Sequence, residues 1–426
     1  MSEEIENITF FFPYPYISGI PVLFSNIANY LAQKDNITIN IIDYENGALK
    51  LSCLKHRRIN FIVFNDFEAC KIDYKTCLII QAGIPYKLRS ELKIGPEVKI
   101  IQWAAHEYNL VPFIFKLKFF RNLQERYHWM YLAVCLLNYH KYKILSKWVL
   151  KMINQGAIVF MTECIYKTTK NHLKFKQPDR ITYMPNLSDG KNAYDEQSII
   201  LKSKEISEIL HICWVGRIAD FKVHILNYSI QSISKLALKI KKHICFHIIG
   251  EGEYLKELNL NCANDFFKLK NVGKLEKSEV DYYLQKHIHC LFSMGTSALD
   301  GARIGLPVVL LDQSYIPIKP GYKFRYLNTV TGFDLGHPIN KDDFEEGNNT
   351  LQVIIEELIS DYRKVSNRCL EHFNENHTIQ IVTEKLLKQF DENYYRINEV
   401  PVELLKQGIG RKIYYYYKKN IKKNFY

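Results

Sequence analysis

The sequence predicts an α/β protein with two doubly wound, Rossmann-like domains that face each other across a cleft. A length of 426 residues favours two or three domains. A composition of 47% hydrophobic and 24% charged residues is ordinary for a globular chain, and it excludes a disordered or collagen-like protein. Short apolar runs alternate with helical patterns in two successive series, which is typical of parallel sheets covered by helices on both faces.

The first series begins with a strand at Ile8–Phe12, the loop PYPYISGIP and a helix with Pro21 near its first turn. The spacing of apolar residues at Leu23, Ile27 and Leu31 supports this helix. Further strands are predicted at Ile37–Ile42, Phe61–Phe64, Leu78–Ile80, Lys99–Trp103, Ala157–Met161 and Arg180–Met184.

A polar stretch at 188–208 interrupts the pattern, and a second series follows it. Its strands are predicted at His211–Val215, Ile244–Ile249, His289–Phe292 and Val308–Leu311, with a helix from about Val223. The predicted organisation is an N-terminal domain at 1–190 with a basic aromatic helical insert at 113–151, a linker at 191–208, a C-terminal domain at 209–375, a long helix at 376–400 and a basic aromatic tail at 401–426.

The ten cysteines are scattered, and none forms a C-x-x-C pair. Several lie inside apolar runs, as small buried residues do in a reducing compartment. The first residues, MSEEIEN, carry acids where a signal peptide needs basic and apolar residues. We therefore expect a cytoplasmic protein.

The net charge of +12 is concentrated in two segments. Residues 113–151 hold eight Lys/Arg and one acid, and 404–426 hold seven Lys/Arg and no acid, so the remainder sums to 12 − 14 = −2. Aromatic residues interleave with these cations, which suits the anionic inner surface of the cytoplasmic membrane. The alternative is a solvated helix face and a frayed tail.

We expect no nucleic-acid partner, because no recognised module is present. We also expect no membrane-spanning helix, because the uncharged run between Arg126 and Lys141 is shorter than the ~20 residues needed.

The first motif is WVGRIADFK, Trp214–Lys222. Gly216 ends a strand, and Arg217 and Lys222 flank the start of the next helix. Backbone N–H groups and the helix dipole attract a diphosphate at such a position, and cationic side chains neutralise it. The alternative is an ordinary glycine turn with surface Arg and Lys.

The second motif is HIIGEGEYLKEL, in which Gly250 and Gly252 follow a strand and open a predicted helix. It lacks the third glycine of the dinucleotide fingerprint, so a tight strand-to-helix turn is the alternative.

The third motif is LFSMGTSALDGARIGLPVVLLD, Leu291–Asp312. Gly295 permits close backbone approach, and Thr296 and Ser297 offer hydroxyl and N–H groups at a helix start. Asp300, one turn later, is placed to accept from a ribose hydroxyl. The alternative is that these residues only cap the helix and complement its dipole.

In this order, with NVGKLEKSEVDYYL between the second and third, the motifs resemble the donor-binding half of GT-B glycosyltransferases. The resemblance is to the bacterial family 4 enzymes that build surface polysaccharides such as lipopolysaccharide and capsule. The loop with Gly19 and the segment YMPNLSD (Tyr183–Asp189) are similar to that family's acceptor domain. The likeness covers about 8–395 and is weak over 113–151 and the tail.

The resemblance implies roles for individual residues. Arg217 and Lys222 would hold the donor diphosphate and stabilise charge on the departing nucleotide. Phe292 stands where the family often has a Glu that contacts the donor sugar. The other expected donor-site residues are Gly216, Gly250 and Gly252, then Gly273, Lys274 and Leu275 against the base, Gly295, Thr296 and Ser297 at the phosphate, and Asp300 at the ribose.

On the acceptor side we expect Ser18, Gly19, His106 and Glu107. Gly19 would leave room at the cleft, and His106, which follows a strand, would hydrogen-bond the sugar or the attacking hydroxyl. The alternative for His106 is a structural histidine.

The implied reaction transfers a sugar from a UDP- or GDP-linked donor to a hydroxyl of a glycan or lipid-linked acceptor, with retention of configuration. The protein would position the reactants and stabilise the leaving group. We expect no cofactor and no essential metal, because the sequence contains no strict Asp-x-Asp and no His/Cys cluster with metal-ligand spacing. A sugar-nucleotide epimerase of the same fold and a non-catalytic nucleotide-sugar or membrane-binding subunit are the competing hypotheses.

Overall fold

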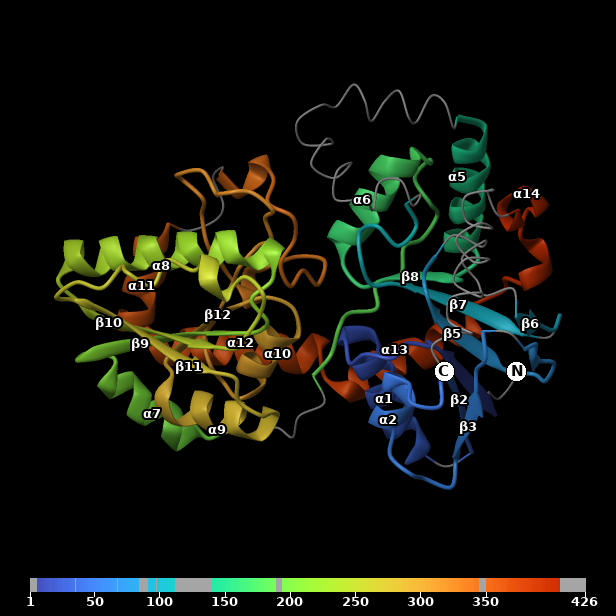
Figure 1. The fold of residues 1–426 in the computed structure, drawn as a ribbon, viewed down its shortest axis with the longest axis horizontal. Coiled ribbons are helices and arrows are strands. Elements are labelled where there is room, and N and C mark those ends of the chain that lie inside the picture. The colour runs from blue at the N-terminus through green and yellow to red at the C-terminus, as the bar shows by residue number, and fades with distance from the viewer. Residues whose placement is uncertain are drawn as a thin grey trace, which may run out of the picture. The chain divides into compact units, whose positions relative to one another are not determined.

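The computed structural model describes residues 6–34, 36–66, 68–83, 91–96, 98–111, 139–188, 194–344 and 350–406. The chain forms two compact units (Figure 1). The first unit is Met1–Met184 with Thr383–Tyr426, and the second is Pro185–Val382. In the described part of the chain, every helix is too short or too polar to cross a membrane.

The first unit is built on a six-stranded sheet with the order β3-β2-β1-β5-β7-β8, in which all neighbours are parallel. Ile8 and Phe10 of β1 are fully buried, as expected for a strand covered on both faces. The strands are β1 (Asn7–Phe11), β2 (Thr38–Asp43), β3 (Ile59–Val63), β5 (Cys77–Gln81), β7 (Lys99–Ala104) and β8 (Ile158–Phe160), and β4 (Cys70–Ile72) pairs with β6 (Leu92–Ile94) in a separate ribbon.

The helices of the first unit come from both ends of the sequence. The early ones are α1 (Gly19–Ala32), α2 (Ala48–Ser52), α5 (Tyr139–Asn154) and α6 (Glu163–Leu173). The chain returns to this unit within α13 (Ile379–Asp391), from Thr383 on, and continues through a 3-10 turn at Ile397–Glu399 and α14 (Val402–Leu405). The Trp148 Nε1–H donates to the Tyr395 hydroxyl at 2.8 Å, so the returning segment is hydrogen-bonded to α5.

The second unit also has a six-stranded sheet, with the order β11-β10-β9-β12-β13-β14. Only the short β14 is antiparallel to its neighbour among these strands. The strands are β9 (Ile209–Val215), β10 (His243–Ile249), β11 (Phe267–Gly273), β12 (Cys290–Ser293), β13 (Val308–Leu310) and β14 (Arg325–Tyr326). The helices are α7 (Glu196–Glu205), α8 (Asp220–Ile240), α9 (Lys277–His287), α10 (Thr296–Arg303), α11 (Leu351–Ser360) and α12 (Tyr362–Asn376), and 3-10 turns lie at Leu255–Glu257, Leu327–Thr329 and Lys341–Phe344.

Alternate residues of β9 enter two separate hydrophobic clusters. Ile212 and Trp214 pack with residues of α8 and α11, whereas Cys213 packs with residues of α9, α10 and α12. This alternation follows from the two-residue period of a strand. The α/β fold with two Rossmann-like sheets is therefore as predicted.

Several predicted boundaries are wrong. Arg180–Met184 forms only an isolated bridge, and the predicted linker at 191–208 contains α7, whose Ile199 is buried in the second unit's core. A 3-10 turn at Leu255–Glu257 replaces the helix expected after Gly252. The long helix predicted at 376–400 is shorter than expected, because α13 ends at Asp391. The linker prediction failed because α7 is mostly polar and buries only Ile199 and Lys202, which hides its helical period.

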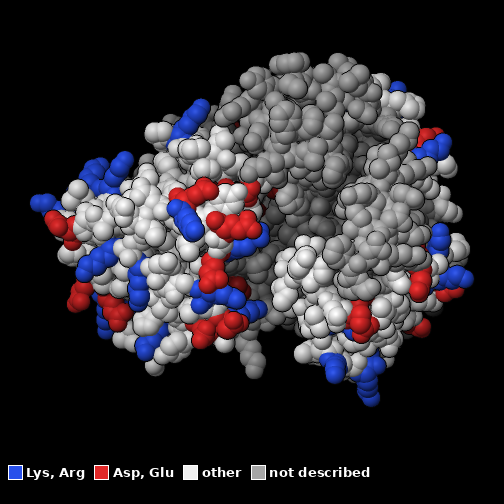
Figure 2. All heavy atoms as spheres, in the orientation of Figure 1, with Lys and Arg blue, Asp and Glu red and all other residues white. Residues whose placement is uncertain are grey.

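The two basic aromatic segments lie mostly outside the described residues, which leave out 112–138 and 407–426. Residues 139–151 belong to α5. On the face drawn in Figure 2, Lys/Arg and Asp/Glu side chains of the second unit are interspersed. This mixture agrees with the nearly neutral sum of the chain outside those segments.

Candidate functional site

The carboxyl ends of β9, β10 and β11 are joined by backbone hydrogen bonds. Gly216 N–H donates to Ile249 O at 3.0 Å, and Gly250 N–H donates to Gly273 O at 2.8 Å. Gly250 has φ +140°, and a Cβ there would lie 2.1 Å from Gly216 O. Only glycine fits such an approach, so Gly250 supports the loop after β9. A Cβ on Gly252 would lie 2.0 Å from Ile218 O, so the second motif has a packing role.

Lys222 lies in the first turn of α8, between two aromatic rings. Its Nζ is 5.5 Å from the centre of the Trp214 ring and 5.6 Å from that of Phe221. Burial, assisted by the charge of Arg217, lowers the pKa of Lys222 to about 8. Among the described residues, Lys222 has no carboxylate within ion-pair distance. Lys222 is partly buried, and a cation withdrawn from water without a counterion is costly, so an anionic ligand would relieve that cost.

The start of α10 lies beside the same glycine. A methyl group on Gly216 would be 3.5 Å from Lys222 Nζ and 3.9 Å from Ser297 Oγ. Gly295, with φ +65°, precedes the helix, and its first N–H groups have no partner within the helix. The structure therefore brings Gly216, Lys222 and Ser297 together at a helix N-terminus.

Two expected donor-site side chains already have protein partners. Thr296 Oγ1 accepts from Asn186 Nδ2 at 3.1 Å, and Asp300 Oδ1 accepts from the Ser188 hydroxyl at 2.6 Å. Burial raises the pKa of Asp300, and the Ser188 bond opposes that shift. The ring of His377 bonds Asn186 O at 2.7 Å. Sequence reasoning missed Asn186, Ser188 and His377 as neighbours of α10, although YMPNLSD marked the segment.

The other predicted donor residues lie at the same edge or in the core. Gly273 ends β11 with φ +81°, Lys274 is exposed, and Leu275 packs against the core. Arg217 is exposed on the loop that follows Gly216. Phe292 is fully buried within β12 and contacts Phe324, with ring centres 5.8 Å apart, so it contributes to the core.

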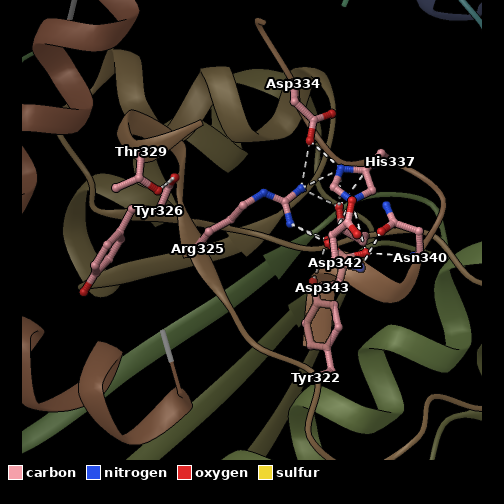
Figure 3. Close-up of polar contacts among 10 residues, drawn as sticks. Tyr322, Arg325, Tyr326, Thr329, Asp334, His337, Asn340, Asp342 and Asp343 are labelled. Carbon is pink, nitrogen blue, oxygen red and sulfur yellow. Dashed lines mark hydrogen bonds and ion pairs between the residues drawn. The ribbon is translucent and has the colours of Figure 1, made fainter. Parts of the chain in front are cut away.

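A buried charge network lies beyond the end of β13 (Figure 3). Arg325 donates to both oxygens of Asp312, which is fully buried, and to Asp334 Oδ2 at 2.8 Å. Although burial opposes the charged imidazole, Asp312, Asp334 and Asp343 raise the pKa of His337 to about 10. His337 Nδ1 is 2.6 Å from Asp334, and Nε2 is 2.9 Å from Asp343. Because the ring is protonated and Arg325 occupies Asp312, this network is not suited to binding a metal ion.

This network supports the loop before α10. Asp334 and His337 flank Leu335, whose carbonyl accepts the Gly295 N–H at 2.7 Å. Gly336, with φ +106°, lies against Leu311 O and Met294 Cβ. Arg325 thus positions the segment to which Gly295 is hydrogen-bonded.

The predicted acceptor-side residues belong to the first unit. His106 and Glu107 follow β7, and His106 Nδ1 is 3.3 Å from Glu107 Oε2. The same Nδ1 accepts the Tyr108 N–H at 3.2 Å. Asn109 Oδ1 accepts from the backbone of both Ala105 and His106 and shapes this turn. The side chain of His106 is half exposed, and that of Glu107 is largely buried.

Ser18 and Gly19 begin α1 at the carboxyl end of β1. The Ser18 side chain makes no cap hydrogen bond, and no atom lies within 4 Å of a Cβ placed on Gly19. Because the carboxyl ends of parallel strands share one sheet edge, these residues lie at the same edge as His106. The contact between His106 and the donor stays a prediction, because the two residue sets belong to different units.

The loop before α1 exposes aromatic side chains that sequence reasoning did not select. Tyr16 is 69% exposed and contacts Tyr14, with ring centres 5.7 Å apart. Asp43 holds this loop, because its carboxylate accepts the N–H groups of Tyr14 and Tyr44 and of two residues at the start of α2.

Comparison with solved structures identifies the class of fold. A glycosyltransferase from Rickettsia africae ESF-5 is 12% identical and has a TM-score of 0.53, and the match covers 95% of this chain and 100% of that one. The N-terminal domain of Candida albicans trehalose-6-phosphate phosphatase is 10% identical with a TM-score of 0.50, covering 91% and 96%. WaaG, a glycosyltransferase involved in lipopolysaccharide biosynthesis, is 12% identical with a TM-score of 0.48, covering 89% and 98%.

The chain has the GT-B fold, with two Rossmann-like domains. No family model matches the sequence, and neither does any curated protein. At these identities the likeness defines the fold, and the activity has to be argued from the site.

Proposed function

We propose that this protein is a glycosyltransferase that transfers a sugar from a nucleotide-diphosphate sugar, UDP- or GDP-linked, to a hydroxyl of a glycan or lipid-linked acceptor. The observation that carries the proposal is Lys222, which is partly buried beside Gly216, Ser297 and the start of α10 and has no carboxylate partner among the described residues. That set of groups suits the diphosphate of the donor.

In the proposed reaction the protein stabilises the departing nucleotide diphosphate. Lys222 contributes a partly buried positive charge, and Arg217 contributes a second positive charge from an exposed side chain. Helix α10 contributes the N–H groups of its first turn. Asp300 would accept from the ribose through Oδ2, because Ser188 bonds Oδ1. His106 would donate its Nε2 proton to the donor sugar or hold the attacking hydroxyl.

The finer points of the proposal rest on the resemblance in the sequence. They are retention of configuration, independence from a catalytic metal or cofactor, and a role in bacterial surface polysaccharide synthesis. A cytoplasmic location, with peripheral contact to the inner face of the membrane through 113–151 and 404–426, belongs to the same proposal.

The first test is thermal unfolding with UDP, GDP, ADP, CMP and the corresponding nucleotide sugars, with and without EDTA. We expect one diphosphate to raise the midpoint by an amount that EDTA does not change. A ligand at 100 times its Kd stabilises the folded state by about 2.7 kcal/mol, which such a scan resolves. If no nucleotide shifts the midpoint, the donor-site assignment is wrong. Product analysis with the matching nucleotide sugar then separates a transferase from an epimerase and from a subunit that binds without turnover.

The pH dependence gives a second test of Lys222. Its pKa of about 8 means that the free protein loses this cation as the pH rises through 8. We expect kcat/KM for the donor to fall above pH 8, since this ratio reports ionisations of the free enzyme. Lys222→Arg should abolish the fall, because a guanidinium stays charged in this range. A profile that is unchanged in Lys222→Arg would contradict the role of Lys222.

A further inference from the structure

Three potential metal ligands lie together on one face of the second unit's sheet, away from the donor edge. Cys245 and His247 are two residues apart on β10, so their side chains point to the same face. His211 on β9 is the direct cross-strand neighbour of Cys245. One ligand atom from each residue lies within 4.8 Å of those of the other two.

We propose that His211, Cys245 and His247 bind a zinc ion that links β9 to β10. Two imidazole nitrogens and one thiolate are ligands that zinc prefers. In a tetrahedral site with Zn–N and Zn–S bonds of about 2.0 and 2.3 Å, two ligand nitrogens are about 3.3 Å apart and a nitrogen and a sulfur about 3.5 Å apart. The observed spacing therefore requires only small side-chain rotations. A water molecule is the fourth ligand, because His211 is only partly buried.

The hydrogen bonds of the two histidines fit this arrangement. His211 Nδ1 and His247 Nε2 are 2.9 Å apart and share one proton, which the metal ion would replace. His247 bonds the Tyr283 hydroxyl through its other nitrogen, Nδ1, at 2.8 Å. A ligating histidine normally donates its second N–H to such a partner, which orients the ring.

One cationic side chain lies close to this group of ligands. The ammonium of Lys270 rests 5.6 Å from the centre of the Tyr283 ring, so it neighbours the site without being one of its ligands.

The position of these residues indicates a structural role. His211 is five residues before Gly216, which is about 16 Å along the strand at ~3.3 Å per residue. The ion would therefore stabilise the sheet and would not touch the donor. The site escaped sequence analysis because its ligands come from two strands 34 residues apart (245 − 211) and only the sheet register brings them together.

The test uses Co²⁺ as a spectroscopic substitute for zinc in the full chain after chelation. We expect one equivalent to give intense visible bands and a thiolate-to-cobalt charge-transfer band in the near ultraviolet. Cys245→Ser should remove the charge-transfer band, and His247→Gln should weaken binding at least tenfold. Tyr283→Phe should weaken it by about tenfold while it leaves the band in place.

His243→Gln is the matched control, because His243 lies on the same strand and is exposed. It should bind one equivalent with an unchanged spectrum. Circular dichroism establishes that each variant is folded, and His211→Gln, at the partly exposed position, provides a second ligand variant. The proposal is overturned if the wild-type chain shows no charge-transfer band, or if the band persists in Cys245→Ser. The nucleotide-induced thermal shift compares the same chain with and without nucleotide. A failure of the zinc proposal therefore leaves the test of the proposed transferase activity unaffected.

Discussion

Lys222→Ala should lower kcat/KM for the donor by about 10²–10³-fold, the usual effect of removing one preorganised group that stabilises developing negative charge. The effect is expected to be large because Lys222 lies against the rings of Trp214 and Phe221 and is partly withdrawn from water. In such a place a charge interacts more strongly than it would in solvent. Steady-state kinetics with the identified nucleotide sugar measures the effect, and the nucleotide-induced thermal shift should diminish in parallel.

Lys235→Ala is the control for that experiment, because Lys235 lies on the same helix with an exposed side chain. It should leave donor kinetics unchanged. Equal turnover and equal nucleotide binding in the wild type and Lys222→Ala would show that the donor diphosphate binds elsewhere.

Arg325→Met should reduce the free energy of unfolding by about 3–5 kcal/mol, the range found when one partner of a buried ion pair is removed. Methionine retains much of the apolar part of the arginine side chain. The decrease in the free energy of unfolding therefore reports the removal of the charge. Asp312 would remain fully buried with its main cation removed, and Asp334 would lose a hydrogen bond. Denaturant unfolding of the full chain measures the change. Because Leu335 accepts the Gly295 N–H, we also expect weaker donor binding in this variant.

Arg363→Met is the comparison for the stability experiment. Arg363 is 3.8 Å from Glu196, and both side chains are more than half exposed. Exposed pairs of this kind contribute little. If Arg325→Met costs no more than Arg363→Met, the buried network is not a determinant of stability.

The sequence by itself determined the fold class and the place of the first glycine motif at a strand end. Alternating apolar runs showed two α/β halves, because a parallel strand must be apolar on both faces. The positions of Gly216 and Lys222 around one strand end could be predicted because a loop and the helix that follows it are local in sequence, and their contact with a phosphate stays a prediction. The same locality placed Ser297 at the start of α10.

Only the tertiary structure decided which residues from distant segments come together. Asp300 bonds Ser188, and Arg325 supports Gly295 through the segment around Leu335, although neither pair shares a local pattern. The packing roles of Gly250 and Gly252 depend on a backbone approach that composition cannot reveal. The cluster of His211, Cys245 and His247 exists because β9 and β10 pair in one register, and a shift of one residue would turn one strand's side chains to the opposite face. Such contacts depend on the packing of whole elements, and for that reason the sequence pattern alone does not contain them.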